Sequence, residues 1–279
     1  MTNRISTILI AVSTISVPST SAMAAFMSTS AGSDVDINLA VGQMIFADIG
    51  PFVSASGTAP PSYDESQTLV NVGADAEVSG LGLLTTGLDV SAGATTAAAE
   101  GAAAGSGTMA TGSSEIAGLN FSFSQSLAGT IGTTLLSFDA DAITSTSSAS
   151  AGGVSGSSFI ENASLGGTLL DTLSIDLGLF TAAGPNTVLL DLLGISIILN
   201  EQIETGDGVN TLGIETNAVH VSLSDFLLGT QLLTGDIYIG RSSAFVELGD
   251  EVAEVPAPAA IGLLGLGLAG LAFARRRRA

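Results

Sequence analysis

The chain has 279 residues, contains no cysteine and no tryptophan, and carries 26 acidic against 6 basic residues, for a formal net charge of −20 at pH 7. The absence of thiols excludes thiol catalysis, zinc–thiolate sites and iron–sulfur clusters. All the acidic residues lie between Asp34 and Glu254, where Arg241 is the only basic residue, so this stretch carries −25. A field of that sign repels phosphate backbones, and we therefore expect no nucleic-acid partner.

Residues 1–24 have the form of a secretory signal peptide. Arg4 precedes a moderately apolar stretch at 5–17, and Ala22 and Ala24 form an A-x-A site for signal peptidase. We expect cleavage after Ala24 and export of the rest of the chain. The alternative is a buried N-terminal strand or helix.

The body, residues 25–254, is predicted to be an extracytoplasmic, acidic, all-β domain of about 230 residues, a length that suits one large domain or two small ones. Period-2 alternation begins at 34–41 and recurs between Gly, Asn and Asp residues, which is typical of antiparallel strands. The further expected strands lie at 68–78, 81–99, 115–126, 133–150, 169–177, 195–203, 212–223 and 235–247. The segment 50–63, with three prolines, is predicted to be a loop.

We predict an antiparallel β-sandwich with long strands. The alternative is a β-solenoid, suggested by a weak internal repeat. Two Gly-Ser-Ser-x-Ile motifs, at 112–116 and 156–160, are 44 residues apart. They also fit two equivalent strand pairs within one sandwich.

The clearest hairpin joins 195–202 to 212–223 through a tip made of turn residues. In this tip Glu204, Asp207 and Asn210 carry oxygens that suit Ca²⁺, although the complete calcium-loop pattern is missing. A plain polar turn is the alternative, and no other cofactor is expected.

His220 is the only histidine, so a catalytic triad would have to use it, and no Gly-x-Ser-x-Gly nucleophile motif accompanies it. We expect a structural histidine. Asp34 with Asp36 and Asp139 with Asp141 are i, i+2 pairs that should share a strand face, and we expect solvated faces rather than hydrolytic pairs. No catalytic residue is predicted, and the protein is not expected to be an enzyme.

The C-terminal segment, residues 255–279, has three parts. Val255, Pro256, Ala257 and Pro258 form a proline motif, an uncharged Gly/Leu/Ala run follows at 259–274, and four arginines end it. Prolines exclude an earlier helix start. A 16-residue helix spans about 24 Å, slightly less than the hydrocarbon core. We predict a transmembrane helix at 259–274, with its cytoplasmic stop at Arg275, Arg276, Arg277 and Arg278.

This segment resembles the PEP-CTERM sorting signal of Gram-negative bacteria, with Ala257 in place of the Glu of Val-Pro-Glu-Pro. The resemblance implies processing by an exosortase near the proline motif. It also implies an inner-membrane intermediate and a final place at the cell surface or in the extracellular matrix. An ordinary single-pass tail anchor is the alternative.

Three segments of the body, 200–202, 216–221 and 235–244, resemble the choice-of-anchor P family. The resemblance extends over roughly 34–248 and implies one extracytoplasmic body fused to different surface anchors, with no known catalysis. Arg241 stands where that family more often has Ser.

Together these features predict a non-enzymatic exported surface or matrix protein, associated with exopolysaccharide or biofilm. The alternatives are a secreted hydrolase using His220 and nearby carboxylates, and a calcium-dependent adhesin.

Overall fold

The computed structural model describes residues 26–41, 44–80, 84–104, 107–127, 132–168, 170, 177–180, 183–228 and 231–249. These residues belong to one compact unit, Ala25–Asp250. The predicted signal peptide and the predicted sorting segment lie outside the described residues. Within the described part of the chain, no helix is both long and apolar enough to cross a membrane.

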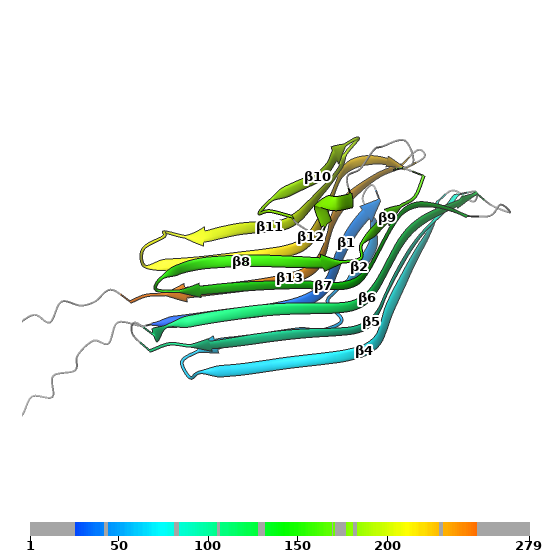
Figure 1. The fold of residues 1–279 in the computed structure, drawn as a ribbon. Coiled ribbons are helices and arrows are strands. Elements are labelled where there is room, and N and C mark those ends of the chain that lie inside the picture. The colour runs from blue at the N-terminus through cyan, green and yellow to red at the C-terminus, as the bar shows by residue number, and fades with distance from the viewer. Residues whose placement is uncertain are drawn as a thin grey trace, which may run out of the picture. The chain divides into compact units, whose positions relative to one another are not determined.

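Two open antiparallel sheets make up this unit (Figure 1). Sheet A has the order β10-β11-β12-β13-β1-β2, with β3 also paired to β1. Its strands are β1 (Met27–Val41), β2 (Met44–Ile49), β3 (Ser54–Ala59), β10 (Thr187–Leu192), β11 (Ile195–Gly206), β12 (Thr211–Leu228) and β13 (Gln231–Glu247).

Sheet B has the order β4-β5-β6-β7-β8, with β9 paired to β7. Its strands are β4 (Tyr63–Gly80), β5 (Leu84–Ala102), β6 (Met109–Leu127), β7 (Thr133–Ser150), β8 (Gly153–Glu161) and β9 (Ser164–Gly166). The prediction of an all-β, antiparallel body with long strands is confirmed.

The internal repeat has a simple structural meaning. Its two copies lie on β6 and β8, on either side of β7, and the register places Gly112 and Gly156 in one row across Ser147. Ile116 and Ile160 likewise share a row. The copies are therefore equivalent strand segments of one sheet rather than coils of a solenoid.

Two local predictions need correction. The segment 50–63 is not all loop, because it contains β3, whose Ser, Ala and Gly residues pair with 28–33 of β1. The strand expected at 169–177 lies largely outside the described residues, and Leu177 begins a short 3-10 helix, Leu177–Phe180. Small residues gave β3 no hydrophobic alternation, so period-2 reasoning missed it.

Large apolar side chains from both sheets fill one half of the space between them, which we call the apolar half. This core is one cluster that draws residues from nearly every long strand. Its most enclosed members include Val35, Ile37, Leu39, Leu88, Leu119, Ile143, Ile197, Leu199, Leu233 and Ile239. Burial of such side chains supplies the main driving force for pairing the sheets.

The other half of the same strands, which we call the small-residue half, is packed differently. Apart from a small cluster around Ile214 and Val246, its interior consists mainly of short side chains, among them Ser28, Ser30, Ala97, Ala99, Ala110, Ser114, Ser145, Ser147, Ala149, Ser242 and Ala244. A Cβ added at Gly32 would collide with the Ser113 carbonyl, and one at Gly112 with the Ala31 and Ser243 carbonyls. The two sheets therefore touch through their backbones here.

A row of left-handed residues separates the two halves. In sheet B the register places Asn71, Gly118 and Asn162 in this row, with φ of 54°, 64° and 49°. In sheet A the row contains Asn200 and Gly240, with φ of 50° and 64°. Asn and Gly are the residues that adopt this conformation most readily.

The alternation of inward and outward side chains shifts by one residue at this row. In sheet A two successive residues point inward, as Asp34 and Val35 do on β1. In sheet B two successive residues point outward, as Asp141 and Ala142 do on β7. Successive side chains on one face of a pleated strand put that face on the convex side of a bend. Both sheets thus bend together (Figure 1), and the outer face of sheet A is concave.

Candidate functional site

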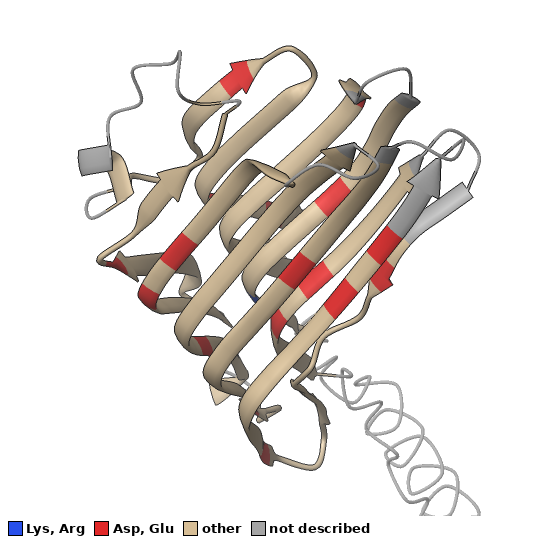
Figure 2. Ribbon diagram, turned by 90° about the vertical axis from the view of Figure 1, so that its right-hand side faces the viewer, with Lys and Arg blue, Asp and Glu red and all other residues tan. Residues whose placement is uncertain are grey.

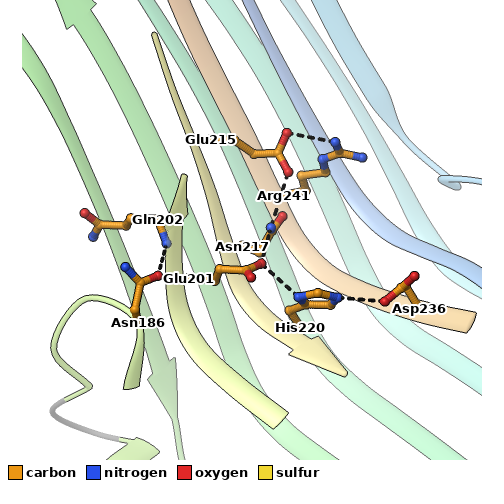
Figure 3. Close-up of polar contacts among 8 residues, drawn as sticks. All are labelled: Asn186, Glu201, Gln202, Glu215, Asn217, His220, Asp236 and Arg241. Atoms are coloured by element: carbon orange, nitrogen blue, oxygen red, sulfur yellow. Dashed lines mark hydrogen bonds and ion pairs between the residues drawn. The ribbon is translucent and has the colours of Figure 1, made fainter. Parts of the chain in front are cut away.

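A polar cluster occupies the outer face of sheet A at this bend (Figure 3). Its members come from three neighbouring strands and from β1, and they are Asp36, Glu201, Glu215, Asn217, His220, Asp236, Tyr238 and Arg241. Strand register brings them together, because Glu201, Asn217 and Arg241 lie opposite one another on β11, β12 and β13. We call this group the elbow cluster.

His220 is held on both ring nitrogens and on one face. Its Nδ1 lies 2.9 Å from Glu201 Oε2, although without hydrogen-bond alignment, and its Nε2 lies 3.0 Å from Asp236 Oδ1. The ring stacks on Tyr238 with centroids 4.4 Å apart. Only 14 % of the His220 side chain is exposed. Both ring nitrogens face carboxylates of neighbouring strands, so the geometry suits a histidine that fixes these strands.

Arg241 neutralises the other end of the cluster. Its Nη2 donates to Glu215 Oε2 at 2.8 Å, Nη1 lies 4.0 Å from Asp36 Oδ2, and the guanidinium lies 5.2 Å from the Tyr238 ring centroid. Burial works to lower the pKa of Arg241, but the hydrogen bond and charge of Glu215 outweigh it, and the pKa is raised. Burial, followed by the charge of Asp236, raises the pKa of Tyr238.

Asn217 connects the His220 end of the cluster to the Arg241 end. Its Nδ2 donates to Glu201 Oε2 at 2.8 Å and to Glu215 Oε1 at 3.3 Å, and the residue is fully buried. A continuous polar chain therefore runs from His220 to Arg241 across three strands. Such a chain links the strands at the bend, because Glu201, Glu215 and Asp236 each lie within reach of a side-chain nitrogen on a neighbouring strand.

The sequence contained a signal for the elbow cluster. The three segments that resemble choice-of-anchor P, at 200–202, 216–221 and 235–244, meet at this place in the fold. Sequence reasoning singled out His220 alone and did not identify Glu201, Glu215 or Asp236 as its neighbours. Their proximity depends on the pairing of β11, β12 and β13, which spacing along the chain does not reveal.

An open groove of about 530 Å³ lies beside the elbow cluster on the outer face of sheet A. Hydroxyl groups, one aromatic ring and one carboxylate contribute to its lining, namely those of Thr29, Ser56, Thr58, Ser243, Phe245 and Glu215. Strand β3 forms part of this lining. Small side chains keep the groove open, since longer ones in the same positions would fill it.

The hairpin tip proposed as a calcium site has another role in the structure. Asp207 Oδ1 accepts hydrogen bonds from the amides of Val209, Asn210 and Thr211, at 2.9, 2.8 and 2.8 Å. These bonds lower the pKa of Asp207 to about 2. They close the turn locally. In the described ranges no group of three or more His, Cys, Asp or Glu is arranged to hold a metal. The contacts favour the polar-turn alternative over a site with Glu204.

The two aspartate pairs behave differently from each other. Asp139 and Asp141 both lie on the outward face of β7, as predicted. The shared solvated face predicted for Asp34 and Asp36 is wrong, because Asp34 is 1 % exposed and points between the sheets while Asp36 points outward. The bend after Asp34 shifts the alternation, and the spacing rule assumes an unbroken strand.

Comparison with known proteins identifies the C-terminal segment. A model of the PEP-CTERM protein-sorting motif matches residues 254–278, which include Val255–Pro258 and Arg275–Arg278. The motif implies an exported protein that is held transiently in the membrane and processed by an exosortase. No curated protein and no solved structure matches the chain. The resemblance of the body to choice-of-anchor P is not reflected in a family match.

Proposed function

We propose that this chain is a non-enzymatic component of the cell surface or extracellular matrix of a Gram-negative bacterium, associated with exopolysaccharide or biofilm. The sorting motif at residues 254–278, behind an all-β body, is the observation that carries the proposal. An exosortase substrate needs a domain that remains folded outside the cell. Antiparallel sheets with a shared core meet that requirement without disulfides.

The proposed route begins with signal peptidase, which cuts after Ala24. Residues 259–274 then hold the chain in the inner membrane, with Arg275–Arg278 in the cytoplasm. Exosortase cleaves near Val255–Pro258 and passes the body, of the choice-of-anchor P type, to the surface. Each step rests on the sequence patterns of the two ends.

The elbow cluster supports a structural rather than a catalytic body. His220 has carboxylates at both nitrogens, and the Glu201 side chain is only 13 % exposed. A general base needs a free nitrogen within reach of a nucleophile's proton. Here the imidazole nitrogens face Glu201 and Asp236, and the cluster binds strands to one another.

The acidic charge on sheet B is not balanced by basic residues, which supports a location of the body in hydrated surroundings. Figure 2 shows acidic positions on neighbouring long strands. Asp64 lies directly opposite Glu100, and Asp75 directly opposite Asp89. The described strands of sheet B contain no basic residue. Like charges in these positions repel, and the repulsion is relieved by water and counterions.

Fractionation of cells with and without the exosortase tests the proposal. We expect the chain at the surface or in the matrix when the enzyme is present, lacking Arg275–Arg278 by intact mass. Without the enzyme it should stay in the inner membrane with its tail. Co-purification with exopolysaccharide, compared with a polysaccharide-deficient strain, tests the association. A tail retained in wild-type cells would contradict exosortase processing and indicate a permanent anchor.

The hydrolase and calcium alternatives have their own tests. Loss of a hydrolytic activity in folded His220→Ala, with the activity kept in Asp48→Asn, would favour the enzyme. For calcium, thermal unfolding is compared with Ca²⁺ and with monovalent salt at matched ionic strength. An equal effect of both salts means screening alone. A larger effect of Ca²⁺ that Asp207→Ala removes would favour the adhesin.

A further inference from the structure

Asp34 is a carboxyl group enclosed between the two sheets. It lies on β1 in the row where both sheets bend, and it is 1 % exposed. Its Oδ1 accepts a hydrogen bond from the Val53 amide at 3.2 Å, and its own amide donates to the Val53 carbonyl at 3.4 Å. Val53 directly precedes β3, so Asp34 fixes the point at which that strand begins.

Among the residues that the structure describes, no cation balances this carboxyl group. In the described residues the two basic side chains, Arg241 and His220, lie on the outer face of sheet A. Tyr63 on β4 packs against the cluster that contains Val53, and its hydroxyl hydrogen-bonds with Ser30 Oγ at 2.9 Å. Other titratable groups on the surrounding strands point outward. They are Asp36 on β1, Asp236 and Tyr238 on β13, Asp89 and Glu100 on β5, and Glu115 on β6.

The carboxyl group of Asp34 also lies near a hydroxyl of sheet B. Thr95 on β5 is fully buried and approaches the carboxyl group, yet neither Thr95 Oγ1 nor Asp34 Oδ2 has an aligned hydrogen-bond partner among the described groups. One hydrogen bond between the two groups can pair both atoms in either protonation state: Thr95 Oγ1 donates to the ionised carboxylate, and the O–H of the neutral acid donates to Thr95 Oγ1. Only the neutral acid makes this contact without a buried, uncompensated charge.

Burial has a defined electrostatic effect here. Desolvation raises the pKa of Asp34 above its ordinary value of 3.8, and this outweighs the opposing hydrogen bonds from the Val35 and Val53 amides and from Thr95. The folded state therefore holds the proton more tightly than the unfolded state. The stability that this proton contributes is complete below pH 3.8 and is lost as pH rises through the raised folded-state pKa.

We propose that Asp34 is a proton-operated clasp between the sheets: the neutral acid donates to Thr95 of sheet B while it accepts from Val53, and loss of the proton loosens β3. Strand β3 is held by its pairing with β1 and by a small cluster formed by Val53, Ala55, Ala97 and Ala99. Ionisation places a buried charge without a countercharge beside that cluster. Because Ser56 and Thr58 line the groove, the proton state of Asp34 also controls the shape of the groove.

The direct test is an NMR titration of the carboxyl carbons in the processed protein recovered from cells. We expect the Asp34 midpoint above those of the exposed aspartates, with Asp48 on β2 as the internal reference. Amide exchange in 54–59, corrected for the intrinsic rate, should accelerate by up to about tenfold per pH unit between the ordinary value of 3.8 and that midpoint, and it should level off above the midpoint. Exchange in the core of β12 should not change in this way.

Substitution provides the second test. Asp34→Asn keeps an acceptor for Val53 and a donor for Thr95 at every pH. In this variant the amide exchange of β3 should be slow and should not show the pH-dependent acceleration, which we call the step. Asp48→Asn, on an exposed side chain, should retain the step. An Asp34 midpoint at or below about 4 would overturn the proposal, as would an unchanged step in Asp34→Asn. The titration of the wild-type protein decides the question even where the variant does not fold.

Discussion

The apolar half and the small-residue half are built from the same strands and solve the same packing problem in opposite ways. In the apolar half, Leu, Ile and Phe side chains separate the sheets and fill the space. In the small-residue half, Gly, Ala and Ser allow the backbones to touch, and buried hydroxyls bond across the gap. Burial of apolar area tolerates some repacking. Backbone contact tolerates none, because the colliding atoms have no alternative rotamer.

Hydrogen bonds replace apolar area as the specific link in the small-residue half. Ser147 Oγ of sheet B lies 2.9 Å from Thr216 Oγ1 and 3.0 Å from Ser242 Oγ of sheet A. Gln202 Nε2 donates to the Gly156 carbonyl at 2.8 Å. These contacts fix the lateral position of one sheet on the other. The comparison of the halves leads to four predictions, in order of expected effect.

Gly112→Val should be the most damaging change. Its side chain would meet the carbonyls of Ala31 and Ser243, which belong to two paired strands of sheet A. We expect a loss of at least about 4 kcal/mol in the free energy of unfolding, or no folding at all. Urea unfolding measures it. The control is Gly50→Val, where nothing lies within 4 Å of the new Cβ. Equal stability of the two variants would show that the sheets can separate in this half.

Leu119→Ala should reduce the free energy of unfolding by less than Gly112→Val does, although it removes buried apolar atoms. Leu119 is 1 % exposed in the apolar core, and truncation there leaves a cavity that neighbours partly fill. We expect about 3 kcal/mol, measured by the same unfolding experiment. A larger loss than that of Gly112→Val would reverse our ranking of the two halves.

Ser147→Ala should have an intermediate effect that comes from hydrogen bonding alone. It removes the link between Thr216 and Ser242, and both hydroxyls are buried. We expect a loss of about 2 kcal/mol. Ser148→Ala is the matched control, because Ser148 bonds only to the exposed Ser155, and it should cost less than about 0.5 kcal/mol. Similar losses in the two would mean that the buried link contributes nothing specific.

The smallest effect is expected at Asp207, outside both halves. Because three amides lower its pKa to about 2, its contribution is present above the ordinary value of 3.8 and is lost as pH falls through 2. Thermal unfolding of the wild-type protein and of Asp207→Ala should therefore differ slightly at pH 5 and converge near pH 2. A difference that persists in acid would assign the effect to the turn geometry rather than to the charge.

Sequence reasoning reached the strands of the apolar half because Val35, Ile37 and Leu39 alternate with polar residues. It was weaker where side chains are short, and β3 was mistaken for a loop. The sequence does not predict the bend, because a single Asn or Gly in a strand, such as Asn71 or Gly118, is equally compatible with a bulge, a turn or a close approach of another backbone. Only the pairing of strands shows that these residues share a row.

The elbow cluster shows the same limit. The segments around Asn217 and Arg241 were noticed as a resemblance, and His220 was expected to be structural. Their contacts depend on register, which is set by strand pairing over long separations. The burial of Asp34 was missed for a related reason, since the alternation rule places it beside Asp36 until the bend is known.

Because the left-handed residues lie in one row, the strands of each sheet bend together at the same position rather than independently. Each strand is hydrogen-bonded to neighbours that turn in the same row, so no strand can straighten alone. An inserted residue in any one strand would move its kink out of line and set it against both neighbours. The angle of the body is therefore a collective property, and the concave face that carries the elbow cluster keeps its curvature as long as the sheets remain paired.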